Sequence, residues 1–202
     1  MAAGIRAIVV GGSAGALDAL HQILPALPAG FPIPIALVLH VHPSKPSYLA
    51  RVLGARCALT VKEAEDKEPI APAMLYLAPP NYHLLVERRG CFSLSVDDPV
   101  LFSRPAIDVL FESAADAFGP ALAGLLLSGG SEDGARGLAE IKAKGGLTVV
   151  QAPSTASVPI MPEAALRLAV IDQVLPLAEI GLFLARLGAA GRDPRGGAWR
   201  RT

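Results

Sequence analysis

The hydrophobic positions of the chain follow two patterns that alternate along its length. Short runs that are apolar at almost every position, such as 33–39 and 122–127, are typical of strands buried on both faces of a parallel sheet. In other segments apolar residues recur at every third or fourth position, as in an amphipathic helix, and 107–118 is the clearest of these. Strands that alternate with helices predict a parallel sheet covered by helices on both faces.

The same two patterns predict the rest of the fold. We expect further strands at 7–10, 59–64, 74–78, 147–151 and 173–175, and further helices at 17–24, 48–53, around 138–144, from Pro162 onward and at 180–187. Pro105 is expected in the first turn of the helix at 107–118. Two short strands, 84–86 and 92–96, predict an antiparallel hairpin. The predicted fold class is therefore α/β: a three-layer α/β/α arrangement with a mainly parallel, doubly wound sheet and a β-hairpin at one edge.

Composition narrows the class of protein without naming a function. The chain has 202 residues, of which 52% are hydrophobic and 18% charged, so we expect one globular domain over 1–188. From 189 to 202 glycine, alanine and arginine dominate, and we expect this tail to be disordered. Lys plus Arg equals Asp plus Glu at 18 each, which gives no electrostatic reason to expect nucleic acid as a partner.

Two further features bear on location and metal binding. The apolar runs are too short to span a bilayer, and no secretory signal precedes them, so we expect a cytoplasmic protein with no membrane insertion. Cys57 and Cys91 are far apart and belong to no metal-binding motif, which favours reduced, buried thiols. The sequence thus predicts neither a metal nor a cofactor.

The first predicted strand leads into a glycine-rich turn that holds Ser13. Gly11, Gly12 and Gly15 surround this serine, and a helix follows at once. Such a serine is a candidate nucleophile, because a sharp turn exposes its hydroxyl beside the positive end of a helix dipole. The same turn also suits an anion or dinucleotide site, or a close turn with no chemical role.

Two other candidate residues come just after predicted strands. His40 follows the strand at 33–39, and Asp133 follows the strand at 122–127. Carboxyl ends of parallel strands meet at one edge of a sheet, so Ser13, His40 and Asp133 could form a catalytic triad there. His42 competes with His40 as the base, and Glu132 could replace Asp133. Asp133 could alternatively cap the helix that follows it.

The other titratable side chains give weaker signals. His21 lies inside a predicted helix and is expected at the surface or partly packed. His83 is expected in a loop that could line the rim of the site. Asp108 and Glu112 are assigned to the polar face of the helix at 107–118, where we expect them to be solvated.

Several collinear blocks of the chain resemble the catalytic domain of the chemotaxis protein-glutamate methylesterases, the CheB family. The resemblance covers roughly 5–187 and implies an α/β fold with a triad formed by Ser13, His40 and Asp133, which favours His40 over His42. It also implies hydrolysis of γ-glutamyl methyl esters on chemoreceptors, with deamidation of certain glutamines as a related activity. The blocks are Val10-Gly11-Gly12-Ser13-Ala14-Gly15, Val38-Leu39-His40 with Pro43, Tyr76-Leu77-Ala78-Pro79-Pro80-Asn81-Tyr82-His83, Arg104-Pro105-Ala106-Ile107-Asp108-Val109-Leu110-Phe111, Ser128-Gly129-Gly130 with Asp133-Gly134, and Gln151 with Met161-Pro162.

For the oxyanion hole, the candidates are the backbone N–H groups of Gly12, Ala14, Gly130 and Ser131. One departure concerns this hole, because the family commonly has a Gly-Met-Gly type segment where this chain has Gly129-Gly130-Ser131-Glu132.

The resemblance implies methylated cytoplasmic helices of chemoreceptors as partners. Family members typically carry a receiver domain ahead of the catalytic domain, whereas this chain begins at the first catalytic strand. We therefore expect a protein that is either constitutively active or regulated by a receiver-domain protein in trans.

Other functions remain open at this stage. A non-catalytic module could keep the fold and use the Ser13 loop to hold an anion or a partner peptide. An esterase of the same type could act in a signalling pathway other than chemotaxis. A nucleotide-binding protein is disfavoured, because Gly11-Gly12-Ser13-Ala14-Gly15 is not G-x-G-x-x-G.

Overall fold

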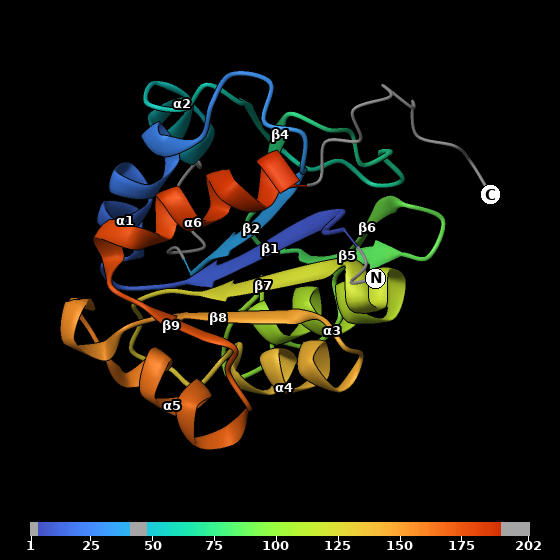
Figure 1. Cartoon of the computed structure of the whole chain (residues 1–202). Coiled ribbons are helices and arrows are strands. Elements are labelled where there is room, and N and C mark those ends of the chain that lie inside the picture. Colours follow the sequence, from blue (N-terminus) through green and yellow to red (C-terminus); the bar gives the residue numbers. More distant parts are fainter. Residues whose placement is uncertain (1–3, 41–47, 191–202) are drawn as a thin grey trace.

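A seven-stranded parallel sheet forms the centre of the molecule, as the computed structural model shows for residues 4–40 and 48–190 (Figure 1). The strand order is β3-β4-β2-β1-β7-β8-β9, and every neighbouring pair is parallel. The three central strands are buried at every position. The strands are β1 (Ala7–Gly12), β2 (Ile35–Leu39), β3 (Thr60–Glu63), β4 (Met74–Leu77), β7 (Leu122–Leu126), β8 (Leu147–Gln151) and β9 (Gln173–Leu175).

Helices cover both faces of this sheet and create two apolar layers. Helices α1 (Ala16–Ile23), α2 (Leu49–Gly54) and α6 (Leu177–Ala190) cover one face (Figure 1). Helices α3 (Ile107–Phe118), α4 (Ala135–Ala143) and α5 (Ile160–Leu168) cover the other. The predicted three-layer α/β/α class is confirmed. Short 3-10 turns lie at Leu24–Ala26, Gly119–Ala121 and Pro153–Thr155.

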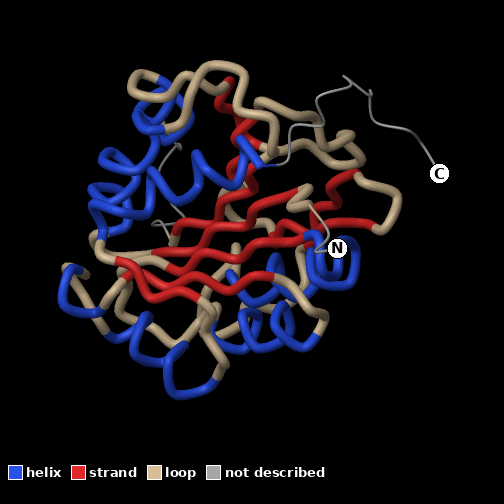
Figure 2. The backbone as a smooth tube through the Cα atoms, in the orientation of Figure 1, coloured by secondary structure: helices blue, strands red, loops and turns tan. Residues whose placement is uncertain are grey.

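The predicted hairpin is present as β5 (His83–Glu87) and β6 (Cys91–Ser95). These two strands pair only with each other as named strands and form a second, two-stranded sheet, so they do not extend the main one (Figure 2). The apolar side chains of the hairpin pack in the same core as α3, and the backbone N–H of Val86 donates to Ser113 Oγ at 3.1 Å. Contacts with a helix therefore anchor the hairpin.

The strand order changes direction between β1 and β7. From β1 the chain proceeds through β2 to β3 and β4 on one side, and then crosses to β7, β8 and β9 on the other. In open parallel sheets, functional sites gather beyond the carboxyl ends of the strands at such a switch point. The loops that follow β2, β1 and β7 lie there, because these three strands are neighbours.

Some predicted boundaries differ from the observed ones. Pro105 precedes α3, because Ala106 is the N-cap residue and the helix begins at Ile107. Helix α6 continues to Ala190, two residues into the predicted tail, and the rest of that tail lies outside the described residues, as does His42. No helix within 4–40 and 48–190 has the length and apolar character needed to cross a membrane.

Candidate active site

Ser13 lies in the turn between β1 and α1, as the glycine-rich pattern predicts. Its backbone N–H donates to the carbonyl oxygen of Ser128 at 2.9 Å, and its own carbonyl accepts from the N–H of Ala16 at 3.0 Å. Gly15 has a φ of 81°, in the left-handed region that favours glycine. A Cβ atom on Gly15 would also lie 2.6 Å from Ser157 Cβ. The turn therefore requires glycine for both its conformation and its close packing.

His40 follows β2 directly beside the Ser13 turn. Gly12 at the end of β1 is in register with Leu39 at the end of β2, so Ser13 and His40 are the next residues along two adjacent strands. The N–H of His40 donates to the Gly12 carbonyl oxygen at 3.1 Å, which continues the sheet pairing to this point. The two side chains thus project from neighbouring positions at one edge of the sheet.

Asp133 lies within hydrogen-bond distance of His40. His40 Nε2 is 2.8 Å from Asp133 Oδ2, and the Asp133 side chain is 0% exposed, against 13% for His40. The backbone N–H of Ile107 donates to Oδ2 at 2.7 Å, and that of Asp108 donates to Oδ1 at 2.9 Å. Three donors around a buried carboxylate offset the cost of removing its charge from water.

These contacts show what each alternative for Asp133 looks like in the fold. The side chain of Asp133 caps α3, a helix that lies earlier in the chain. It does not cap α4, the helix that follows it in the chain. It contacts His40 at the same time, so the cap and the contact with histidine coexist. Glu132 is exposed and lies 3.3 Å from Arg167 Nη2. It does not take the place of Asp133.

Ser128 and Gln151 hold the loops of the site together. Ser128 Oγ donates to the Ala14 carbonyl oxygen at 2.7 Å and accepts from the N–H of Val158 at 2.9 Å. Gln151 Oε1 accepts from the N–H of Ser128 at 3.0 Å, and its amide donates to the Thr155 carbonyl oxygen at 2.9 Å. Sequence reasoning did not identify this role for Ser128, because a serine in a glycine-rich loop carries no signal of its distant partners.

Gly129 allows a close approach behind Ser13. A Cβ atom on Gly129 would lie 2.6 Å from Met161 Cε and 3.0 Å from Ser13 Cβ. Met161 is fully buried, and its N–H donates to the Gly129 carbonyl oxygen at 2.9 Å. The methionine side chain therefore packs against the loop at a point where only glycine leaves enough room.

The four candidate oxyanion donors lie in different settings. Gly12 is a strand residue paired with Leu39 inside the sheet. Among the hydrogen bonds of residues 4–40 and 48–190, none uses the backbone N–H of Ala14, Gly130 or Ser131. The hydroxyl of Ser131 accepts from the N–H of Asp133 at 3.0 Å. Three of the four candidate N–H groups thus have no hydrogen-bond partner among the described residues.

The expectation that Asp108 is solvated is wrong. Asp108 is 2% exposed, and its Oδ1 accepts from the N–H groups of Gly134 at 2.9 Å and Gly137 at 2.7 Å. Burial, together with the nearby charge of Asp133, raises the pKa of this carboxyl to about 6. Glu112 is 38% exposed and pairs with Arg136 at 2.9 Å, which agrees with its assignment to the polar face.

The expectation that His83 lies in a rim loop is also wrong. His83 is the first residue of β5 and is 1% exposed. Its Nδ1 accepts from the N–H of Ala106 at 3.2 Å, and its Nε2 lies 3.1 Å from the Asp98 carbonyl oxygen. The histidine is thus a buried link between the hairpin and the segment that leads into α3.

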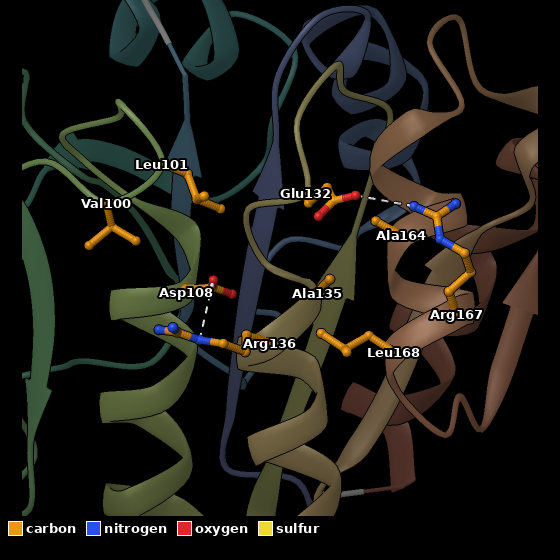
Figure 3. A pocket seen from close by; sticks show the side chains of 9 residues that line it. All are labelled: Val100, Leu101, Asp108, Glu132, Ala135, Arg136, Ala164, Arg167 and Leu168. Atoms are coloured by element: carbon orange, nitrogen blue, oxygen red, sulfur yellow. Dashed lines mark hydrogen bonds and ion pairs between the residues drawn. The ribbon is translucent and has the colours of Figure 1, made fainter.

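A pocket of about 350 Å³ lies beside this site (Figure 3). The residues that line the pocket near Asp133 are Asp108, Glu132 and Ala135. Two arginines also line it, Arg136 from α4 and Arg167 from α5. Val100 and Leu101 close the opposite side. Phe102, next to Leu101 in the chain, is fully exposed. The pocket therefore combines apolar walls with two ion pairs.

Comparison with known proteins shows the family of the chain and agrees with its fold. Residues 8–184 match the family model of the CheB methylesterase. The crystal structure of the Thermotoga maritima CheB methylesterase catalytic domain superposes with a TM-score of 0.86 at 34% identity, covering 92% of this chain and 100% of that one. By fold and match, the molecule is a methylesterase domain of the α/β class.

Relatives with similar sequences belong to the same family. A Leptospira interrogans protein, provisionally named a protein-glutamate methylesterase/protein-glutamine glutaminase, is 47% identical over 190 residues, covering 94% of this chain and 98% of the relative. A Symbiobacterium thermophilum protein of the same name is 36% identical over 92% of this chain, which spans only 51% of that relative. The chain belongs to the CheB methylesterase family.

Proposed function

We propose that this protein hydrolyses methyl esters of glutamate side chains on methylated chemoreceptors, with Ser13 as the nucleophile, His40 as the base and Asp133 as the residue that orients His40. The observation that carries the proposal is the hydrogen bond between His40 and Asp133 at the carboxyl edge of the sheet, one strand away from Ser13. Membership of the CheB methylesterase family supports the same chemistry.

The contacts of His40 assign a role to each ring nitrogen in the proposed mechanism. Nε2 is engaged by Asp133, so Nδ1 is the nitrogen left to exchange a proton with Ser13. Ser13 Oγ forms a bond to the ester carbonyl carbon while its proton passes to His40. The bond from carbon to the methoxy oxygen then breaks, and His40 returns the proton to release methanol. Water hydrolyses the glutamyl-enzyme by the reverse sequence and leaves a glutamate carboxylate.

The tetrahedral intermediate needs donors for its oxyanion. The N–H groups of Ala14, Gly130 and Ser131 support this role, because no other described residue uses them and they flank the Ser13 turn and the loop before Asp133. The loss of one such donor typically lowers the rate by about 100- to 1,000-fold. Gly12 is the weakest of the four candidates, because it is paired within the sheet.

The same acyl-enzyme could form from a glutamine side chain, with ammonia as the leaving group. The names of the Leptospira and Symbiobacterium relatives include a protein-glutamine glutaminase activity, which supports deamidation as a second reaction of the proposed site. Control by a receiver-domain protein in trans stays a prediction from the sequence.

The test is methanol release from methylated cytoplasmic fragments of chemoreceptors. We expect the wild-type protein to release methanol and Ser13→Ala to reduce the rate to background. Ser154→Ala is the matched control, because Ser154 is an exposed serine whose side chain makes no hydrogen bond among the described residues, and this variant should keep wild-type activity. A folded wild-type protein that releases no methanol, or a Ser13→Ala variant as active as the control, would contradict the proposal.

A further inference from the structure

Helices α3 and α4 both begin without a side-chain cap from their own N-cap residue. The N-cap residue is Ala106 for α3 and Gly134 for α4, and neither provides a side-chain hydrogen bond. The first N–H groups of a helix have no partner inside the helix, so buried helix starts need acceptors from elsewhere. Both helix starts are buried here, since Ile107, Asp108, Gly134 and Ala135 are all buried.

Each helix receives its acceptor from an aspartate that belongs to the other. Asp133, which precedes α4, accepts from the N–H groups of Ile107 and Asp108 at the start of α3. Asp108, in the first turn of α3, accepts from the N–H groups of Gly134 and Gly137 at the start of α4. The two aspartates therefore cap each other's helices, in an arrangement that we call the reciprocal cap.

This arrangement acts directly on the backbone of Asp133. Gly134 is the next residue in the chain, so the bond from its N–H to Asp108 Oδ1 at 2.9 Å holds the peptide group that leaves Asp133. In the other direction, the N–H of Asp108 donates to Asp133 Oδ1, the carboxylate oxygen that does not contact His40. Asp108 thus fixes Asp133 through both its backbone and its side chain.

Close contact between the helices makes this possible. A Cβ atom on Gly137 would lie 2.4 Å from Phe111 Cβ and 3.3 Å from the Asp108 Cα atom, so the lack of a side chain at Gly137 lets α4 pack directly against α3. Arg136 is the nearby cation, with its Nε 3.9 Å from Asp108 Oδ2, and it is 65% exposed. Arg136 also pairs with Glu112, so the charge of Asp108 is only partly balanced.

We propose that Asp108 is a positioning residue for the candidate triad: by completing the reciprocal cap with Asp133, it holds the Asp133 carboxylate in the orientation that bonds His40. The proposal rests on the proposed function for its kinetic consequence. Among the described residues, the side chain of Asp108 bonds only the N–H groups of Gly134 and Gly137 and pairs with Arg136, and its own N–H donates to Asp133, so its role is to act through Asp133.

Three substitutions separate the geometry of Asp108 from its charge. Asp108→Asn keeps an oxygen that can accept from Gly134 and Gly137 but removes the charge. Asp108→Ala removes the acceptor, and Asp108→Glu keeps the charge but moves the acceptor outward by one methylene. Asp116→Asn is the matched control, because Asp116 lies on the same helix, is exposed and pairs with Lys144 away from the site.

The kinetic experiment measures kcat and KM separately for methanol release, at a temperature well below the unfolding midpoint of each variant. We expect Asp108→Asn and Asp116→Asn to stay within threefold of wild type. We expect Asp108→Ala and Asp108→Glu to lose about 10- to 100-fold in kcat with KM within threefold, because a small displacement of an orienting group costs this much. If the alanine variant does not fold, the glutamate variant carries the test.

The second readout does not depend on catalysis. The proton shared by His40 Nε2 and Asp133 is observable by NMR as a downfield histidine N–H resonance, which should stay in Asp108→Asn and shift or disappear in folded Asp108→Ala or Asp108→Glu. A loss of stability alone would not move this resonance in a folded sample. The proposal is wrong if a folded alanine or glutamate variant keeps both kcat and the resonance, or if the asparagine variant loses as much kcat as they do.

These readouts also separate the two proposals. Absence of methanol release by the wild-type protein would contradict the proposed function, and the resonance of His40 would still report whether Asp108 positions Asp133. Wild-type activity together with an unchanged resonance in the folded alanine or glutamate variant would contradict the role of Asp108 alone.

Discussion

His40 and Asp133 are 93 positions apart in the chain, and the structure brings His40 Nε2 to 2.8 Å from Asp133 Oδ2. The contact forms because β2 and β7 lie on either side of β1, so their carboxyl ends meet at the same edge of the sheet. Asp133 is fully buried and held by the start of α3. The geometry of the fold therefore sets this pair before any substrate is bound.

The orientation of His40 gives the first prediction. Asp133→Asn removes the charge that stabilises a protonated His40, and its amide nitrogen replaces an oxygen that accepts a backbone N–H of α3, so the side chain no longer holds the His40 ring in its orientation and tautomer. We expect kcat to fall by about 1,000- to 10,000-fold, as when a triad histidine is held in the wrong tautomer. Glu132→Gln is the neighbouring control, because Glu132 is exposed and its side chain bonds only Arg167 among the described residues. Steady-state methanol release measures both, and equal activities would contradict the role of Asp133.

The turn at Ser13 gives the second prediction. Gly15→Ala should destabilise the fold and lower activity, because Gly15 has a φ of 81° and its Cβ would lie within 3 Å of Ser157 and Ser128. Gly30→Ala is the control for backbone strain without a steric clash, since Gly30 has a φ of 74° and a Cβ atom there would have no atom within 4 Å. Left-handed strain costs about 1–2 kcal/mol in either variant. Urea unfolding should show a larger loss for Gly15→Ala, and equal losses would mean that the packing is unimportant.

The hydrogen bonds of Ser128 give the third prediction. Ser128→Ala leaves the Ala14 carbonyl oxygen and the Val158 N–H without this partner. Both bonds are partly buried, and a hydrogen bond contributes about 0.5–1.5 kcal/mol net, so the free energy of unfolding should fall by about 1–3 kcal/mol. We also expect a lower kcat, because Ala14 belongs to the Ser13 turn. Ser154→Ala should change the free energy of unfolding by no more than about 0.5 kcal/mol, as is usual for an exposed position.

The buried carboxyl of Asp108 gives the fourth prediction. Burial raises the pKa of Asp108 in the folded protein from 3.8 to about 6, so between these values the folded state binds a proton that the unfolded chain has released. This group therefore makes the fold less stable as the pH rises from about 4 to 6, by up to about 3 kcal/mol.

The matched variant for that effect is Asp108→Asn, which cannot titrate. The free energy of unfolding of the wild type, relative to this variant, should decrease from pH 4 to pH 6 and then level off. Urea denaturation at several pH values measures the difference. A difference that stays constant over this range would show that Asp108 has the same pKa in the folded and unfolded states.

Much of the fold could be predicted because the signals were local. Residues 33–39 and 122–127 are apolar throughout, and each contains an observed buried strand. The positions of Ser13, His40 and Asp133 could be predicted for a related reason, since each directly follows such a strand or the short loop after it. The parallel topology then implied that they share one edge.

The contacts of Asp108 could not be predicted in this way. Its partners lie 26 and 29 residues away at the start of another helix, and one carboxylate oxygen, Oδ1, meets both because Gly137 lets the two helices touch. A weaker signal was present, because Asp108 lies three and seven positions before Phe111 and Ala115, which places it on the same buried face of α3. For His83, the partners are backbone groups of a loop, and no pattern in the sequence marks them.

The measurement that tests the central claim most directly is a double-mutant comparison of methanol release by wild type, Ser13→Ala, His40→Ala and the variant with both substitutions. Residues that act as one catalytic unit are strongly non-additive. We therefore predict that each single variant loses nearly all activity and that the double variant loses no more. If the two losses instead multiply, or if His40→Ala keeps most of the wild-type rate, Ser13 and His40 do not act together as nucleophile and base.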